Sequence, residues 1–336
     1  MSNYKSIKGT TIKEFSIDPI TLPVGQMWFN SSTSKFKIYS NAPYLAAWSM
    51  AANTPIYTEG NGGFGTQTAA VFAGGYNTDP LAYSRVESWN YDGNVYTASS
   101  NMGTDRGYMS GVGAGTQTAG LIAGGYIAAQ LGGTNLTEEY DGSTWTFSGN
   151  MIAAPYEHSM RGTQTAAVAS GSYGTELYDG TSWTSGGIHI HPGNNFNPAA
   201  GGTQTALIQA GGGMFSTYLS DSYFFDGTTW TSGPTRMIPR NTSGGFGTQT
   251  AFNINGGFQQ DPFIPEWGGI FAQITELYDG TVWSTSASQG VSHNMCATAG
   301  NSSAGISMGG NPGDYSSYLS YTEELNATGG PTLTEL

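Results

Sequence analysis

Four histidines and a single cysteine are the residues of this chain best suited to metal or nucleophilic chemistry. His189 and His191 are separated by one residue, and alternate residues of an extended segment point to the same side, so their rings are placed to share a metal ion. Two ligands make a weak site, and the simpler interpretation is a pair of exposed polar residues in the loop from Gly187 to Gly201. Cys296 is the only thiol, so it builds neither an internal disulfide nor a thiolate zinc cage. We therefore expect neither a resident metal nor another cofactor.

Two further patterns resemble catalytic motifs without the context that such motifs need. Residues 60–65 read Gly-Asn-Gly-Gly-Phe-Gly, the spacing of a dinucleotide-binding loop, but that loop needs a parallel strand before it and a helix after it. The paired carboxylates Glu138-Glu139 and Glu323-Glu324 are adjacent in predicted strands, so the two members of each pair point to opposite faces. The sequence favours a protein that is not an enzyme, and glycosidase chemistry by some other pair of carboxylates is the alternative that stays open.

The elements that must position these residues belong to an internal repeat. Gly-Thr-Gln-Thr-Ala occurs five times, at intervals of 50, 47, 40 and 45 residues, and a degraded sixth copy begins at Gly300. Each copy runs into a short apolar stretch, and five units continue to an aromatic-Asp-Gly turn that is followed by a Tyr or Trp ring. The five pentapeptides are residues 65–69, 115–119, 162–166, 202–206 and 247–251. The rings are Tyr96, Trp145, Trp183, Trp230 and Trp283.

Each unit predicts four short antiparallel strands. Asp-Gly between strands is typical of a tight hairpin, because Gly adopts the positive φ that such turns require. A composition of 51 Gly and 14 Pro, with 13% aromatic and only 10% charged residues, excludes a helical bundle and a disordered chain. A lone four-stranded sheet cannot bury both of its faces, and units of 40 to 50 residues are typical of propeller blades. We therefore predict an all-β propeller with six four-stranded blades.

The two ends of the chain complement each other. The sixth unit supplies a third strand near residues 321–326 but no ring-bearing fourth strand. Residues 39–50 copy the end of a unit, with Tyr39-Ser40-Asn41 in the position of the aromatic-Asp-Gly turn and Trp48 as the ring. We expect the segment around Trp48 to complete the last blade, which removes exposed sheet edges. A seventh blade, built from residues 27–39 and the C-terminal tail, is the alternative.

Three resemblances follow from these motifs. The order Gly-Gly, Tyr-Asp, Trp and Met within a unit resembles the kelch repeat, which implies a propeller with tryptophan rings packed between blades. Residues 24–39 alternate apolar and polar side chains around an Asn-Ser-Ser turn, which predicts a hairpin, and resemble the Gly-x-x-Trp-aromatic-Asn hairpins of bacteriophage tail-fibre and appendage proteins. Gly-Thr-Gln-Thr-Ala followed by Gly-Gly resembles kelch-like propellers of tailed, marine-type phages. The resemblance implies a virion protein, in a tail fibre, an appendage or a capsid decoration, assembled in the host cytoplasm.

The charge is divided unevenly along the chain. Residues 1–37 contain all five lysines against two carboxylates, a net charge of about +3, and the rest of the chain has a net charge of about −16. An acidic body repels nucleic acid and anionic membranes, whereas a short basic arm docks on an acidic partner; a merely soluble tail is the other interpretation. No apolar run approaches the roughly 20 residues of a membrane span, and the N-terminus lacks the apolar region of an export signal. We expect a docking arm and hairpin at residues 1–41 and a propeller at residues 42–336. The docking residues are Lys5, Lys8, Lys13, Trp28, Lys35 and Lys37.

Recognition is expected on one face of the propeller. The turns between strands one and two and between strands three and four share a face and are nearly identical from unit to unit, whereas the opposite connections vary greatly in length. Loops on a rigid scaffold usually carry recognition, and aromatic rings beside Asp, Asn and Gln suit sugars as well as protein partners. We expect this face to contact other virion proteins in a multimeric particle or a host-surface glycan. The candidate residues are Asp79, Tyr83, Tyr126, His189, His191, Tyr218, Asp261, Phe263, Trp267 and Tyr315.

Overall fold

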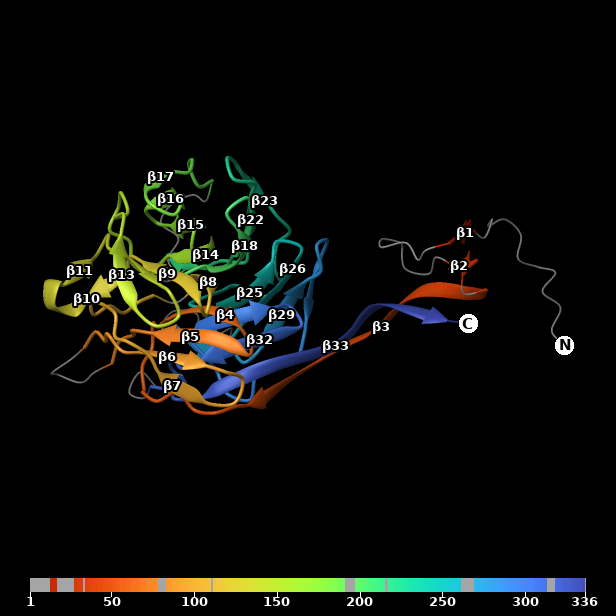
Figure 1. Ribbon diagram of the computed structural model, residues 1–336, viewed down its shortest axis with the longest axis horizontal. Coiled ribbons are helices and arrows are strands. Elements are labelled where there is room, and N and C mark those ends of the chain that lie inside the picture. The colour runs from red at the N-terminus through yellow and green to blue at the C-terminus, as the bar shows by residue number, and fades with distance from the viewer. Residues whose placement is uncertain are drawn as a thin grey trace. The chain divides into compact units, whose positions relative to one another are not determined.

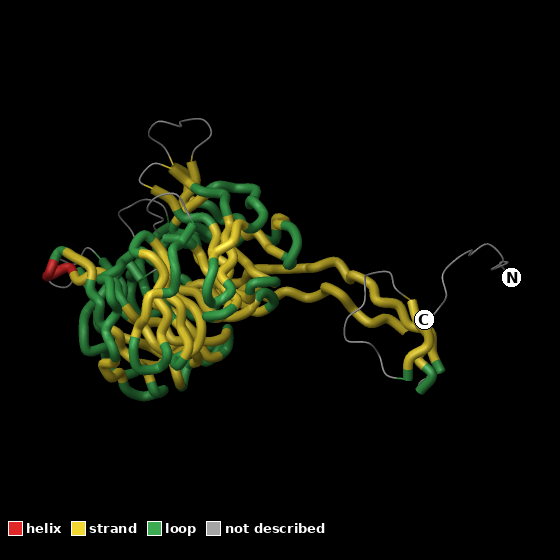
Figure 2. Tube along the Cα trace, turned by 90° about the horizontal axis from the view of Figure 1, so that it is seen from above, coloured by secondary structure: helices red, strands yellow, loops and turns green. Residues whose placement is uncertain are grey.

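The computed structural model describes residues 13–16, 27–32, 34–77, 83–109, 111–190, 197–214, 217–260, 269–312 and 318–335. The chain divides into two compact units, a larger one of Ala47–Asn326 and a smaller one made of Met1–Ala46 and Ala327–Leu336. Regular structure in the described ranges is strand apart from one turn of 3-10 helix, η1 (Ala128–Gln130), as Figure 2 shows. The prediction of an all-β chain is confirmed.

Five sheets have four antiparallel strands each, paired in chain order within the sheet (Figure 1). The first contains β4 (Gly62–Thr66), β5 (Ala69–Ala73), β6 (Ser88–Tyr91) and β7 (Tyr96–Ala98). The second contains β8 (Ala114–Thr116), β9 (Ala119–Ala123), β12 (Thr137–Tyr140) and β13 (Trp145–Ser148). The third contains β14 (Ser159–Thr163), β15 (Ala166–Gly171), β16 (Gly174–Tyr178) and β17 (Trp183–Ser185). The fourth contains β18 (Ala199–Thr203), β19 (Ala206–Ala210), β22 (Ser222–Phe225) and β23 (Trp230–Ser232). The fifth contains β25 (Gly244–Thr248), β26 (Ala251–Asn255), β29 (Thr275–Tyr278) and β30 (Trp283–Thr285).

The sixth sheet combines strands from both ends of the chain. Its order is β31, β32, β33, β3, β2 and β1, so β3 follows β33 where the other sheets have their fourth strand. Just after β3, the Ala51 amide donates to the Thr322 carbonyl at 2.9 Å. The strands are β31 (Ala297–Asn301), β32 (Ala304–Met308), β33 (Thr322–Glu335), β3 (Lys35–Met50), β2 (Met27–Asn30) and β1 (Lys13–Phe15).

Small sheets occur in the connections between second and third strands and before the fifth sheet. Two have two strands and one has three. They contain β10 (Tyr126–Ile127) with β11 (Gly132–Gly133), β20 (Gly213–Met214) with β21 (Thr217–Tyr218), and β24 (Arg240–Asn241) with β27 (Phe258–Gln260) and β28 (Gly269–Phe271).

The first strands of the six sheets contact one another in a cycle, β4 to β8, β14, β18, β25, β31 and back to β4. Second strands bury apolar side chains between neighbouring sheets; Phe72, Leu121 and Ile306 are fully buried examples. Each sheet is thereby covered on both faces by its neighbours, which a four-stranded sheet needs. The fold is β-propeller-like.

The glutamine of the repeated pentapeptide ties its sheet to the preceding one. Gln117 Nε2, in the turn between β8 and β9, donates to the carbonyls of Ala70 and Tyr91, both at 2.9 Å, on β5 and β6. The acceptors of Gln67 lie on β32 and β33. The same pair of bonds is made by Gln164, Gln204 and Gln249. The pentapeptide is therefore an inter-sheet fastening as well as a turn.

The aromatic ring at the fourth strand also bonds to the preceding sheet. Trp183 Nε1 donates to Thr137 Oγ1 at 2.9 Å. The prediction that these rings pack between neighbouring sheets is confirmed. The equivalent bonds run from Trp145 to Ser88, from Trp230 to Thr175, from Trp283 to the Pro234 carbonyl, from Trp48 to Thr275, and between the hydroxyls of Tyr96 and Thr322.

The smaller unit contains the predicted hairpin. Strands β2 and β3 pair antiparallel, with Trp28 opposite Lys37 and Asn30 opposite Lys35. Trp28 is fully buried and Lys35 is exposed. A short parallel strand, β1, lies beside β2, with Lys13 opposite Trp28, and the sequence pattern did not predict it.

One predicted turn is wrong. Tyr39-Ser40-Asn41 lies inside β3, which runs without interruption from Lys35 to Met50. In the five aromatic-Asp-Gly turns, Gly has a φ between 95° and 99°. Asn41 occupies the glycine position here and stays in the strand, because without glycine the positive φ of the turn is unfavourable. Strand β33 likewise continues to Glu335, past the predicted end near residue 326.

Candidate binding face and central channel

The turns on one face of the larger unit repeat the same hydrogen bonds. In the turn after β16, Asp179 Oδ1 accepts from the backbone N–H groups of Ser182 and Thr181, both at 2.8 Å. These bonds lower the pKa of Asp179 to about 2. Equivalent bonds are accepted by Asp92, Asp141, Asp226 and Asp279. Such uniform turns are scaffold.

The opposite face, which we call the connection face, contains the loops that enter the first strands and join second to third strands. At its centre, six backbone hydrogen bonds form a circle, which we call the mouth ring. The bonds run from Gly60 N to Met295 O (2.7 Å), Met109 N to Gly60 O (2.8 Å), Glu157 N to Tyr108 O (3.0 Å), Asn197 N to Glu157 O (2.7 Å), Thr242 N to Asn197 O (3.2 Å) and Met295 N to Thr242 O (3.0 Å).

The mouth ring holds its residues in an unusual conformation. Gly60 has a φ of 63°, and the five other residues, Tyr108, Glu157, Asn197, Thr242 and Met295, have φ values between 50° and 56°. Residues with a side chain rarely adopt a positive φ, at a cost of about 1–3 kcal/mol each. The circle of hydrogen bonds compensates for this strain and fixes where these side chains begin.

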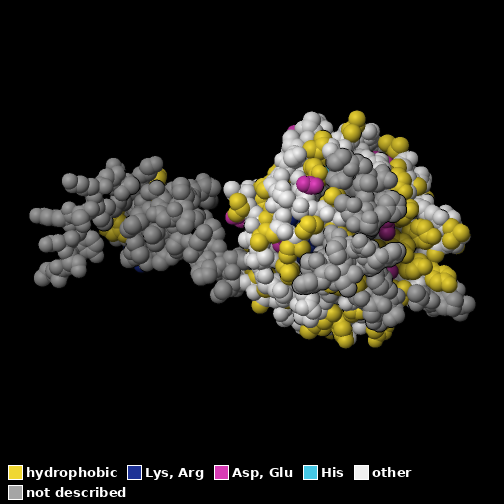
Figure 3. Space-filling view, turned by 180° about the vertical axis from the view of Figure 1, so that it is seen from behind, with side chains coloured by type: hydrophobic (Ala, Val, Ile, Leu, Met, Phe, Trp, Pro, Cys, Tyr) yellow, Lys and Arg dark blue, Asp and Glu magenta, His cyan; other side chains and the backbone are white. Residues whose placement is uncertain are grey.

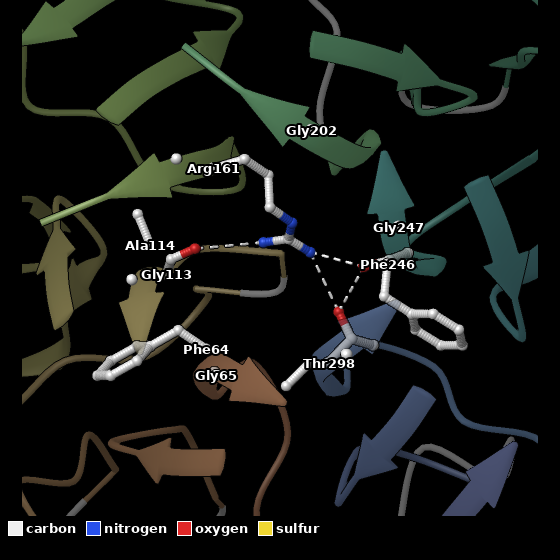
Figure 4. A pocket seen from close by; sticks show the side chains of 15 residues that line it. Phe64, Gly65, Gly113, Ala114, Arg161, Gly202, Phe246, Gly247 and Thr298 are labelled. Atoms are coloured by element: carbon white, nitrogen blue, oxygen red, sulfur yellow. Dashed lines mark hydrogen bonds between the residues drawn. The ribbon is translucent and has the colours of Figure 1, made fainter. Parts of the chain in front are cut away.

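Arg161 crosses a narrow channel between the first strands (Figure 4). The cavity there has a volume of about 130 Å³ and is lined mostly by glycines. All five guanidinium N–H groups have acceptors, and no carboxylate among the described residues pairs with this cation. Burial lowers its pKa to about 10, so Arg161 is charged at neutral pH. The acceptors are Ala200 O (2.9 Å), Gly111 O (2.7 Å), Met160 O (2.8 Å), Gly245 O (2.7 Å) and Thr298 Oγ1 (3.1 Å).

Arg161 therefore joins strands and does not offer a ligand site. Its acceptors lie on or beside β8, β14, β18, β25 and β31. Since every donor is occupied, no guanidinium N–H remains for a bound anion. The side chain fills the channel and connects sheets across it.

A larger polar pocket opens at the mouth ring. Its volume is about 520 Å³, within the range of small-molecule sites. Burial raises the pKa of both its carboxyl groups, Glu59 and Glu157, and hydrogen bonds from Asn311 and Asn197 partly offset this. The lining residues are Glu59, Tyr108, Tyr156, Glu157, Asn197, Gly213, Asn241, Thr242, Phe258, Asn294, Met295 and Asn311.

A row of six tyrosines leads to this pocket. Neighbouring ring centroids are 5.0 to 6.3 Å apart, and every ring is at least partly exposed. Tyr108 and Tyr156 belong both to the row and to the pocket lining. In spatial order the row is Tyr83, Tyr76, Tyr108, Tyr126, Tyr156 and Tyr173. Aromatic faces and polar groups are thus combined on one surface.

Three of the predicted binding residues lie at or beside this surface. Tyr83 and Tyr126 are in the tyrosine row, and the Tyr218 ring packs 5.6 Å from Phe258, which lines the pocket. His189 lies elsewhere, with its ring 4.2 Å from Trp230 and bonded to Gln209. Outside the described residues are Asp79, His191, Asp261, Phe263, Trp267, Tyr315, Lys5 and Lys8.

Glu59, Glu157 and Asn197 are not among the residues predicted from the sequence. A signal exists: in five of the six units the mouth-ring residue stands five positions before the first glycine of the pentapeptide or its degraded copy. In the second unit the spacing is seven, at Tyr108. The residue types differ from unit to unit, so no motif marks this position.

Buried clusters of acidic and basic side chains in the larger unit hold the loops that connect its sheets. Glu276 Oε2 lies 3.0 Å from Arg236 Nη1 and 2.9 Å from Arg240 Nη2, and its other oxygen accepts the amide of Met237 at 2.8 Å. Glu138 pairs with Arg106. These groups are buried and partnered, which fixes the incoming loops and gives Glu138 and Glu276 a structural role.

Cys296, His158 and His293 are also packed away in the interior. Burial raises the pKa of Cys296 to about 12 and lowers the pKa of His158 to about 4. His293 bonds to Glu323 at 3.0 Å. Within the described ranges, no three His, Cys, Asp or Glu side chains are grouped to hold a metal ion.

Uncharged side chains dominate the surface drawn in Figure 3, where a few acidic groups stand among apolar and neutral polar ones. In the part of the chain that the structure describes, no helix has the length and apolar character to cross a membrane.

Neither the protein-family models nor the curated proteins compared with this chain match it. Solved structures do match. One of them is the structure of YjhT, which is 10% identical, with a TM-score of 0.66 over 83% of this chain and 99% of that chain. At this identity the likeness shows a shared fold alone.

Proposed function

We propose that this chain is a kelch-like, six-bladed β-propeller that serves as a non-enzymatic structural protein of a tailed-phage virion. It forms part of a tail or head appendage and presents its connection face to other virion proteins and to host-surface glycans. The repeat and the N-terminal hairpin, which resemble those of phage appendage proteins, support the assignment to a virion.

Three cyclic patterns support six blades closed by β3. First strands contact one another in a cycle of six, and six backbone bonds form the mouth ring. The ring-to-sheet bonds also close: Trp48 bonds to Thr275 of the fifth sheet, and Tyr96 of the first sheet bonds to Thr322 of the sixth. In this arrangement Trp48 takes the place of the missing ring in the sixth blade, as the sequence predicts.

We assign the binding role to the connection face because the two faces differ. One face repeats the same Asp-centred turn in five sheets, whereas the connection face combines a polar pocket with a row of partly exposed tyrosines. Tyrosine provides a large, rigid contact area with a polar end, which suits both protein and sugar partners. The loops of the connection face can therefore serve in recognition while the turns on the other face serve the fold.

The basic arm provides attachment to the particle in this proposal. A net charge of about +3 in residues 1–37 is attracted to an acidic surface on a partner protein. Deleting residues 2–34 tests this, because the deletion ends before β3 and keeps Trp48. We expect a protein with an unchanged melting temperature that is absent from purified particles.

The control for that experiment is Tyr57→Ala, which removes a side chain that is 64% exposed in the larger unit. This variant is expected to enter particles normally. Normal incorporation of the deleted protein, measured by quantitative mass spectrometry of particles, contradicts docking through the arm.

A carbohydrate-active enzyme, such as a polysaccharide depolymerase, is the second candidate function. It is favoured by Glu59 and Glu157, two carboxyl groups with raised pKa that line one pocket, since a glycosidase needs a carboxylic acid that stays protonated. The test is release of reducing sugar from host polysaccharide. If the parent protein releases it and Glu157→Gln does not, this function replaces the first.

A further inference from the structure

The pocket at the mouth ring and the tyrosine row form one continuous surface of mixed polar and aromatic character. We propose that they bind an uncharged polysaccharide chain, with a sugar unit in the pocket and the following units along the tyrosine row. This deepens the proposed recognition role, rests on the connection face being a binding face, and names the class of ligand.

The charges of the pocket select against anionic sugars. Its lining contains two carboxyl groups and four asparagines, and no lysine or arginine stands among the described residues that line it. A uronate or a sialic acid carries a carboxylate for which this lining offers no cationic partner, whereas neutral hydroxyl groups find donors and acceptors on the amides. The ligand that fits is rich in hydroxyl groups and uncharged.

Asn197 supplies an acceptor that is still open. Asn197 is only 5% exposed, and its Oδ1 has no hydrogen-bond partner. A buried acceptor without a partner is unfavourable, and a ligand hydroxyl in the pocket restores the missing bond. This residue therefore points to a bound donor.

The mouth ring keeps the pocket in its binding shape. Tyr108, Glu157, Asn197 and Thr242 are held at positive φ by the circle of backbone bonds, so little conformational freedom is lost when a ligand binds. Local strain held in this way is common where a site must be preformed.

The tyrosine row extends the site from the pocket across three sheets. Tyr76 stacks on Tyr108 with centroids 5.0 Å apart, and Tyr126 lies 5.4 Å from Tyr108. Tyr83 and Tyr173, at the two ends, are 41% and 46% exposed. A sugar presents an apolar C–H face to such rings and its hydroxyls to the phenol oxygens, so a chain of sugars fits a row better than one ring does.

Binding of the purified full chain to dextran, mannan and galactan, with alginate as the anionic probe, tests the proposal by biolayer interferometry. We expect at least one neutral polysaccharide to bind and alginate not to bind. Tyr126→Ala and Asn197→Gly are expected to weaken binding at least tenfold. Asn197→Gly keeps the fold, because glycine accepts the positive φ, as Gly60 does in the first unit.

Phe147→Ala is the matched control, since it removes an exposed aromatic ring from β13, away from the row, and is expected to change the dissociation constant less than twofold. The proposal is overturned if no neutral polysaccharide binds, if alginate binds as tightly, or if Asn197→Gly binds as well as the parent. Binding only to virion proteins, with no polysaccharide bound, also overturns it and leaves the structural role intact. The virion role is tested separately, by particle incorporation of the protein that lacks residues 2–34.

Discussion

The indole Nε1 of Trp48 lies 2.9 Å from the hydroxyl oxygen of Thr275 and joins residues 227 positions apart. The same ring packs against Phe246, with centroids 6.1 Å apart and planes at 67°. An N-terminal residue is thus part of the contact between the last two sheets. This contact between sheets therefore depends on a segment that sequence order places before the first repeat.

Replacing Trp48 with alanine tests this dependence. We expect a loss of about 3 kcal/mol in the free energy of unfolding, because a large ring that bridges two sheets is removed. Trp48→Phe keeps most of the packing and loses only the N–H donor, at about 1 kcal/mol. Urea denaturation measures both, and Trp145→Ala, in the equivalent position of another sheet, is the comparison. A Trp48→Ala protein as stable as its parent contradicts a structural role for β3.

Arg161→Met removes the guanidinium donors of five acceptors. We expect a loss of about 3 kcal/mol, since five bonds from a buried cation are removed, although Gly111 O and Gly245 O keep a second donor. Arg161→Lys is not expected to restore stability, because one ammonium group cannot reach acceptors in opposite directions. Arg85→Met, at a partly exposed ion pair, is the control and is expected to cost less than about 1 kcal/mol. Thermal unfolding measures both variants. If Arg161→Met loses no more stability than Arg85→Met, Arg161 does not bridge the sheets.

Gln164→Glu exchanges an amide donor for a carboxylate of the same shape. The Gln164 amide donates to the carbonyls of Gly120 and Tyr140 at 3.1 and 3.0 Å, so a carboxylate there loses both bonds and faces two oxygens. We expect a loss of about 2 kcal/mol or more, and about 1–2 kcal/mol for Gln164→Ala. Thr165→Ala, at the exposed next position, is expected to change stability by less than about 0.5 kcal/mol. Equal stability of the Glu and Gln proteins at pH 7 would falsify the fastening role of this side chain.

Glu157→Gln is expected to raise the melting temperature at pH 7. Burial raises the folded-state pKa of Glu157 above its ordinary value of 4.5, so the folded state binds the proton more tightly than the unfolded state does. The stability contributed by this group is full below pH 4.5 and is lost as the pH rises through the folded-state pKa. Glutamine has no charge to bury, so the gain at pH 7 should vanish near pH 4. Calorimetry at both pH values decides, and a variant that melts earlier than its parent at pH 7 contradicts a binding-site role for this carboxyl.

Local patterns in the sequence were sufficient to predict the repeated elements. Asp-Gly and Gly-Thr-Gln-Thr set the hairpins because turn type depends on which residues accept a positive φ, and the alternation at residues 27–39 predicted the N-terminal hairpin. The same reasoning explains the one wrong turn, since Ser40-Asn41 lacks the glycine and the strand continues. The tryptophan rings were correctly predicted to pack between sheets, because each repeat offers one large ring at the same place.

Only the tertiary structure decided what meets at the centre. Glu59 and Asn311 are 252 residues apart and bond at 3.2 Å, and Arg161 gathers acceptors as far apart in the sequence as Gly111, just before β8, and Thr298, on β31. Most of these acceptors are backbone carbonyls, which every residue has, so no sequence motif announces them. The mouth ring depends on such long-range backbone contacts too, because its residue types change from unit to unit while its backbone bonds repeat. The sequence determined the sheets and their turns, and the contacts between sheets determined the pocket.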